Sequence, residues 1–157
     1  MKVAVVDTGV DSTHPFLKGR ILSGYNLVDG DNTQQDGHGH GTHVSGTIVD
    51  CTPGLDISII PVRVLNDNGS GYDSVIGLGI RYAVDQGANV INLSLGGYGH
   101  SENIGEQIDY AISKNVTVVV AAGNESDNTE LYCPAHNTKC ITVAAVDINK
   151  NQAYFSN

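Results

Sequence analysis

Short, uninterrupted apolar runs alternate along this chain with segments whose apolar residues recur every three or four positions. The runs predict strands buried on both faces, as in a parallel sheet, because such strands expose no polar side. We expect five strands: Val3–Val6, Ile57–Val64, Val90–Ser94, Thr117–Ala122 and Cys140–Val146. Pro61 is the awkward residue in the second strand, since proline has no N–H to donate to a sheet.

The segments with helical spacing predict two amphipathic helices, and a third helix follows a glycine-rich turn at His40. The first runs from Ser74 to Gln86, with Asp73 or Ser74 as N-cap and Gly87 beyond its end. Its apolar face comprises Val75, Ile76, Ile80, Ala83 and Val84. The second spans Asn103 to Lys114 and buries Ile104, Ile108, Ala111 and Ile112. This alternation predicts a three-layer α/β fold with a mostly parallel central sheet and right-handed crossovers.

Composition fits one globular domain over residues 1–157. The chain is 40% hydrophobic and contains 19 glycines, as expected of a packed core with many tight turns. The net charge of −9, with only 8 lysines and arginines, argues against a nucleic-acid surface or a polybasic membrane patch. No stretch approaches the roughly 20 apolar residues of a membrane span. The N-terminal residues do not form the pattern of a signal peptide.

The three cysteines give a weaker indication of the cellular compartment. Cys133 and Cys140 flank a turn-rich stretch that can bring them together, and a disulfide between them would favour an oxidising compartment. Sequence alone leaves that pairing open, because disulfide geometry is demanding. Cys51 is expected to be a free, partly buried thiol. No Cys-x-x-Cys pair is present, which argues against a thiolate zinc site.

Three polar side chains stand at positions suited to catalysis. Asp7 ends the first strand and Asn124 follows the strand Thr117–Ala122, so both are expected at the carboxyl edge of the sheet. His40 lies in the glycine-rich turn that opens a helix, where a substrate can reach the imidazole. A carboxylate that orients an imidazole base, together with a nearby amide donor, is a set of groups that catalyses nucleophilic acyl transfer.

Together these blocks resemble the subtilisin-like serine peptidases, including thermitase-like members. The matching segments are Asp7-Thr8-Gly9, His40-Gly41-Thr42-His43 and Ala121-Ala122-Gly123-Asn124, with lesser matches at Gly69-Ser70-Gly71 and Ser94-Leu95-Gly96-Gly97. The resemblance implies that Asp7 orients His40, that His40 is the base, and that Asn124 donates to the oxyanion. It also implies that an extended peptide lies between Gly69–Gly71 and Ser94–Gly96, with Ala122 and Gly123 lining the same groove.

The nucleophile that the resemblance requires is not found. The family carries it in a Gly-Thr-Ser segment, and this tripeptide does not occur among the 157 residues. Ser45, Ser94 and Ser156 are poor substitutes by position. We therefore expect the chain to be the front part of a subtilisin-like catalytic domain, inactive alone and able to use a complementary C-terminal fragment.

One loop is a candidate calcium site. Asp29, Asp31, Thr33 and Gln35 alternate along it and offer the oxygen ligands that calcium prefers. The loop resembles a calcium-binding loop of thermitase-like members, although Asn26 stands where a third carboxylate is expected. A solvated acidic turn is the equally weighted alternative.

Two functions therefore compete. We favour a serine endopeptidase over a catalytically inactive peptide-binding module, because a module would need no base, orienter and oxyanion donor together. A dinucleotide-binding domain is excluded, since no Gly-x-Gly-x-x-Gly follows the first strand. We favour an extracellular location over a cytoplasmic one.

Overall fold

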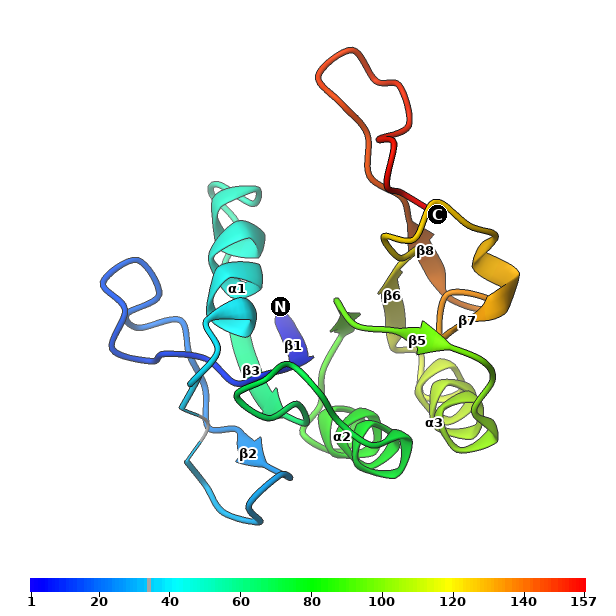
Figure 1. The fold of residues 1–157 in the computed structure, drawn as a ribbon. Coiled ribbons are helices and arrows are strands. Elements are labelled where there is room, and N and C mark those ends of the chain that lie inside the picture. The colour runs from blue at the N-terminus through cyan, green and yellow to red at the C-terminus, as the bar shows by residue number, and fades with distance from the viewer. Residues whose placement is uncertain (34) are drawn as a thin grey trace.

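A six-stranded sheet organises the computed structural model, which describes residues 1–33 and 35–157 (Figure 1). All neighbouring strands of this sheet run parallel, in the order β2-β3-β1-β4-β6-β8. The strands are β1 (Lys2–Asp7), β2 (Tyr25–Asn26), β3 (Ser58–Arg63), β4 (Val90–Leu93), β6 (Thr117–Ala121) and β8 (Ile141–Val143). Two further short strands, β5 (Gly97–Tyr98) and β7 (Tyr132–Cys133), form a separate antiparallel pair.

Helices cover the sheet on both faces, which confirms the three-layer α/β prediction. Alternate residues of β1 point to opposite sides, as strand geometry requires. Ala4 and Val6 join the larger core cluster with α2 (Asp73–Asp85) and α3 (Glu102–Ser113). Val3 and Val5 join a smaller cluster with α1 (His40–Asp50). The central strand is thus buried by both layers.

All five predicted strands are present; β1 extends one residue farther at each end than its apolar run, and the other four strands are shorter than predicted. Pro61 does lie inside β3, opposite Val5 of β1. The backbone groups of Ile59 and Arg63 bond toward the β2 side of β3, and Pro61 shares that side by alternation. Gly24 passes so close there that a side chain on it would collide with Pro61. The missing N–H therefore leaves the β1–β3 ladder intact.

The predicted helices are correct in place but shifted by one residue. Tyr72, rather than Asp73 or Ser74, is the N-cap of α2, and its side chain makes no capping bond. Ser101 caps α3 and accepts a hydrogen bond from the N–H of Ile104. Ile112 was wrongly expected to be buried, because it lies on the solvent side of the last turn and is 38% exposed. A short 3-10 helix, Thr129–Leu131, precedes β7. Among the described residues, no helix has the length and hydropathy needed to cross a membrane.

The Cys133–Cys140 disulfide that the sequence left open is not formed, and Cys51 is a free thiol, as expected, but exposed rather than partly buried. Cys51, Cys133 and Cys140 are all free thiols. Cys133 is buried in the larger core cluster, and Cys140 packs against that cluster. Burial, with Cys133 nearby, raises the pKa of the Cys140 thiol to about 11. Cys51 is exposed, because it caps the solvent-facing end of α1.

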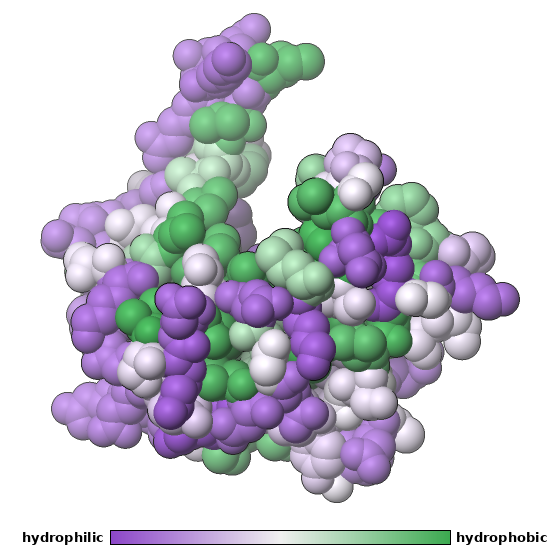
Figure 2. Space-filling view, turned by 180° about the vertical axis from the view of Figure 1, so that it is seen from behind, coloured by the Kyte–Doolittle hydropathy of each residue, from purple (hydrophilic) through white to green (hydrophobic). Residues whose placement is uncertain are grey.

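The edge of the sheet at β8 carries exposed apolar side chains. The segment after β8 leaves the body as a long excursion and returns toward β6 (Figure 1). Apolar residues gather along this excursion and at its base on the face shown in Figure 2. Those of β8 and the excursion that stand more than half exposed are Ile141, Val143, Val146, Ile148 and Tyr154. An apolar sheet edge of this kind is a surface that proteins normally cover.

The two isoleucines of α3 provide a matched test of this core. Ile108 is fully buried and Ile112, one turn later, is 38% exposed. We expect Ile108→Ala to lower the free energy of unfolding by about 2–5 kcal/mol, as buried isoleucines do. Ile112→Ala should cost about 1 kcal/mol or less. Urea unfolding of both variants measures the difference, and equal costs would contradict the assigned orientation of α3.

Candidate active site

Asp7 and His40 meet at the carboxyl edge of the sheet. The Asp7 carboxylate lies at the end of β1 and is fully buried, while the His40 side chain, on the first residue of α1, is 42% exposed. His40 Nδ1 lies 2.7 Å from Asp7 Oδ1 and 2.9 Å from Oδ2. The backbone N–H of Thr8 also donates to Oδ1, at 2.7 Å. A buried carboxylate accepts hydrogen bonds only, so the imidazole carries its proton on Nδ1 and directs Nε2 outward.

A second carboxylate, Asp36, holds the turn that carries His40. Its Oδ1 accepts hydrogen bonds from the Thr8 hydroxyl (2.8 Å) and the Gly39 N–H (2.7 Å). Its Oδ2 accepts from the N–H (2.9 Å) and hydroxyl (2.6 Å) of Thr42. Burial acts to raise the pKa of Asp36, but these hydrogen bonds outweigh it and the pKa is lowered. Asp36 thus ties β1, the turn and α1 together.

Gly41 allows α1 to approach β1 closely. A β-carbon at this position would collide with the carbonyl oxygen of Gly9 and touch Asp7. The Gly41 N–H donates to the Thr8 hydroxyl at 3.0 Å, on the same side. Glycine is therefore required at position 41 for Asp7 and His40 to come within hydrogen-bonding distance.

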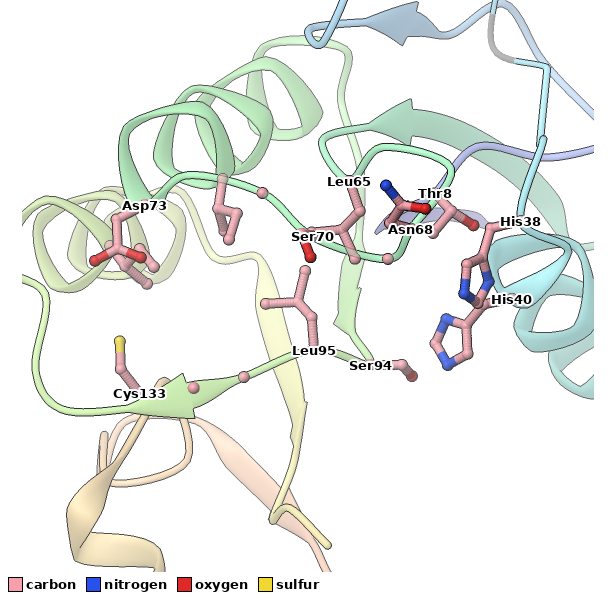
Figure 3. A pocket seen from close by; sticks show the side chains of 16 residues that line it. Thr8, His38, His40, Leu65, Asn68, Ser70, Asp73, Ser94, Leu95 and Cys133 are labelled. Atoms are coloured by element: carbon pink, nitrogen blue, oxygen red, sulfur yellow. The ribbon is translucent and has the colours of Figure 1, made fainter.

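A cavity of about 500 Å³ extends from His40. Figure 3 shows it between the segment from Leu65 to Asp73 and the segment between β4 and β5 that carries Ser94 and Leu95. The lining includes the residues predicted to bind substrate from two sides, Gly69, Ser70 and Gly71 opposite Ser94, Leu95 and Gly96. His38 and His40 stand at one end, and Asp73 and Cys133 at the other (Figure 3). An elongated cavity between two extended segments suits an extended chain.

Asn124 lines a second, smaller cavity of about 90 Å³ together with Ala122 and Gly123. Ser94, Leu95 and Gly96 line both cavities, so the predicted substrate-binding residues border two adjoining cavities that share this segment. Asn124 is exposed, and its N–H donates to the Glu125 carboxylate at 2.8 Å.

The loop around Asn124 is braced by Asn157, a residue that sequence reasoning missed. The Asn157 side chain accepts hydrogen bonds from the N–H groups of Glu125 and Asp127, and donates to the carbonyl of Ala122. It packs so closely that a side chain on Gly123, whose φ is +115°, would collide with it. No periodic pattern in the sequence predicts such a contact, because the contact joins segments that are distant in the sequence.

The comparisons with known proteins agree with this geometry. The family model described as peptidase S8, subtilase family, matches residues 1–157. This chain belongs to the subtilase family. It is 43% identical over 163 residues to thermitase of Thermoactinomyces vulgaris, an alignment that covers 99% of this chain and 58% of thermitase. It is 40% identical over 175 residues to the major intracellular serine protease of Bacillus subtilis, covering 100% of this chain and 53% of that protein.

The fold is that of a solved subtilase. The crystal structure of a cold adapted subtilisin-like serine proteinase matches with a TM-score of 0.93 and 35% identity. The match covers 99% of this chain and 58% of that one, so this subtilase chain spans under two thirds of its relatives' length. Because one relative is named as intracellular, family membership does not fix the compartment, and an extracellular location stays a prediction.

Hydrogen bonds join several described residues of the predicted calcium site of this subtilase to one another and to Arg63. Asp31 accepts from the N–H and hydroxyl of Thr33, which lower the pKa of its carboxyl. Asn26, which is buried, donates to Asp29 at 2.9 Å, and Arg63 donates to the carbonyl of Gln35 at 3.2 Å. The described residues contain no group of three His, Cys, Asp or Glu side chains placed to hold a metal. A calcium site here therefore also requires the oxygens of Thr33 and Gln35, which are of the right chemical kind.

Asp36 makes the stability of this subtilase chain depend on pH. Because folding lowers the pKa of Asp36, its contribution is complete above the unfolded value of about 3.9 and is lost as the pH falls toward the folded value. We expect Asp36→Asn to lower the free energy of unfolding at pH 7 by about 1–3 kcal/mol, through hydrogen bonds weakened or left unmade.

The measurement is urea unfolding at pH 7 and at pH 3 for both proteins. The loss caused by Asp36→Asn should be smaller at pH 3, because the Asp36 carboxyl of the unfolded wild-type chain is then largely protonated. This proton uptake favours unfolding and removes part of the stabilisation that the ionised carboxyl gives the folded state. Asp56→Asn is the control, since the exposed Asp56 receives a bond only on its backbone carbonyl. An equal loss at both pH values would contradict the role given to the charge of Asp36.

Proposed function

We propose that this chain supplies the base, the orienting carboxylate and the oxyanion donor of a serine endopeptidase. The observation that carries the proposal is the pair of contacts, at 2.7 and 2.9 Å, between His40 Nδ1 and the buried carboxylate of Asp7 at the end of an elongated cavity. Relatives named as serine proteases support the reaction class. The nucleophilic serine is proposed to come from sequence outside these 157 residues.

The reaction follows from the orientation of His40. Asp7 holds the Nδ1–H, so Nε2 keeps its lone pair and takes the proton of the serine hydroxyl as that oxygen attacks the peptide carbonyl. Buried Asp7 then stabilises the imidazolium ion that forms. His40 returns the proton to the leaving amine, and water repeats the sequence to release the acyl group.

Asn124 is proposed to donate its side-chain amide to the oxyanion of the tetrahedral intermediate. Three features support this role: the side chain is exposed, it borders the groove, and the loop beneath it is braced by Asn157. A fixed donor needs no reorganisation as the charge develops, which is why such donors stabilise transition states strongly. The substrate backbone is proposed to pair with Gly69–Gly71 and Ser94–Gly96 as an added strand.

An inactive peptide-binding module is the second candidate. The same groove supports it, because pairing with an extended peptide does not need His40. The hydrogen-bonded Asp7–His40 pair favours the peptidase, since burial of a carboxylate is costly and a binding groove gains nothing from it.

The exposed apolar edge at β8 supports a complementary segment as the missing partner. Ile141 and Val143 lie on the outermost strand of the sheet, and each is more than half exposed. A segment that carries the nucleophile and covers this edge would bury these side chains and bring the serine to His40 in one step.

The test expresses the chain alone and together with the nucleophile-bearing segment that completes it. A fluorophosphonate probe, which labels activated serines, should leave the chain alone unlabelled and label the completed protein. In the completed protein, His40→Ala should abolish nearly all turnover of an extended peptide substrate. Asn124→Ala should lower kcat by about 10²–10³, the cost of one oxyanion donor.

Asn128→Ala is the control for Asn124→Ala, because Asn128 is also an exposed asparagine but lies outside both cavities. Near-normal turnover in the His40→Ala protein would contradict the peptidase assignment. Peptide binding without turnover in the completed wild-type protein would favour the inactive module.

We also propose that Asp29, Asp31, Thr33 and Gln35 bind calcium. When bound, the cation would neutralise neighbouring carboxylates and stabilise the folded loop, and calcium at 100 times its Kd would add about 2.7 kcal/mol to the free energy of unfolding. Isothermal titration calorimetry and thermal melts with calcium or a chelator measure binding and stabilisation. Asp31→Asn should remove both effects, whereas the exposed-surface change Glu106→Gln should preserve them. No heat of binding and an unchanged Tm would show that the loop is a solvated acidic turn.

A further inference from the structure

The end of the large cavity remote from His40 has its own chemical character. Its lining includes the apolar residues Ile76 of α2 and Ile104 of α3, and Leu95 lies between this end and His40 (Figure 3). The two labelled groups at this end in Figure 3 are the Asp73 carboxylate and, across the cavity from it, the Cys133 thiol. Burial, with Asp73 nearby, raises the pKa of the Cys133 thiol, so the thiol is neutral near pH 7. Asp73 therefore provides the charge at this end.

The Asp73 carboxylate is available to a ligand. Asp73 is exposed on the first turn of α2, and within the described part of the chain its side chain makes no hydrogen bond or ion pair. Among the described residues, no lysine or arginine lines the cavity, and the histidines that do, His38 and His40, stand at the opposite end. A cation entering this end meets an unpaired carboxylate.

Strand geometry identifies the substrate residue that reaches Asp73. Successive side chains of an extended peptide point to opposite faces, and those two positions apart lie about 6.4–6.8 Å from one another on the same face. If the residue before the cleaved bond enters the small cavity beside Asn124, the second residue points into the large cavity next to His40. The fourth then enters the same cavity farther from His40, at the end with Asp73 and Ile104.

We propose that Asp73 makes this subsite select arginine or lysine as the fourth residue on the N-terminal side of the cleaved bond. The aliphatic stem of such a residue packs on Leu95, Ile76 and Ile104, and its charged end meets the carboxylate at the rim. Long basic side chains suit a subsite with apolar walls and a charged rim, because their aliphatic stems can be buried while their charged ends stay near water. The inference rests on the proposed function, since it uses the same groove and direction of substrate.

The experiment measures binding of tetrapeptide amides X-Ala-Ala-Leu to the full chain. X is arginine or citrulline, which has a closely similar stem but no charge, and binding is followed by amide shifts in ¹⁵N NMR titrations. We expect the arginine peptide to bind about two- to fivefold more tightly, the range of exposed ion pairs, with shifts at Gly69–Gly71 and Ser94–Gly96. High salt should reduce this preference, because it screens exposed charges.

Asp73→Asn should bring the arginine-to-citrulline ratio of affinities to about one, because the partially screened ion pair is lost. Asp73→Lys should invert the ratio, because the attraction becomes a repulsion. Glu106→Gln removes the same charge from an exposed position of α3 outside the cavity and should leave the ratio unchanged. A wild-type ratio of one, or a ratio that Asp73→Asn does not change, would overturn this inference alone. Failure of every peptide to shift the groove amides would overturn the proposed groove, and this inference with it.

Discussion

The buried carboxylate of Asp7 sets the geometry around which the rest of this edge of the molecule is arranged. A carboxylate removed from water is tolerated only when its oxygens accept hydrogen bonds, and here the donors are His40 Nδ1 and the N–H of Thr8. His40 must therefore stay within bonding distance of a strand that is itself fixed at the centre of the sheet. The absence of a side chain at Gly41 permits that approach, and the bonds accepted by Asp36 maintain it.

Sequence patterns were sufficient wherever a local property decided the structure. The short apolar runs predicted five of the six strands of the main sheet, and the inner ones are apolar because they are buried on both faces. The family-like segments located Asp7 and His40, which the structure brings into contact, and the residues that border the groove. Strand β2 and the β5–β7 pair were missed, since two-residue strands are too short to show a periodicity.

The remaining differences arise from contacts between segments distant in sequence. Asp36 and Asn157 are polar residues without a distinctive local pattern, and their importance follows from the backbone groups that the fold brings to them. Ile112 fits the apolar spacing of α3 as well as Ile108 does, yet it lies where no second layer covers it. Whether Cys133 and Cys140 form a disulfide depends on the relative orientation of their thiols, which composition and spacing do not specify.

The strand order also has a consequence for the biosynthesis of the chain. β1 is made first, yet it lies between β3 and β4, and both of these neighbours are made later. Its hydrogen-bonding groups and apolar faces must wait on the ribosome, at elongation rates of about 5–20 residues per second, until both partners have emerged. An apolar strand left unpaired for seconds is prone to incorrect association. A nascent chain of this topology thus gains from chaperones that hold β1 until β4 has emerged from the ribosome.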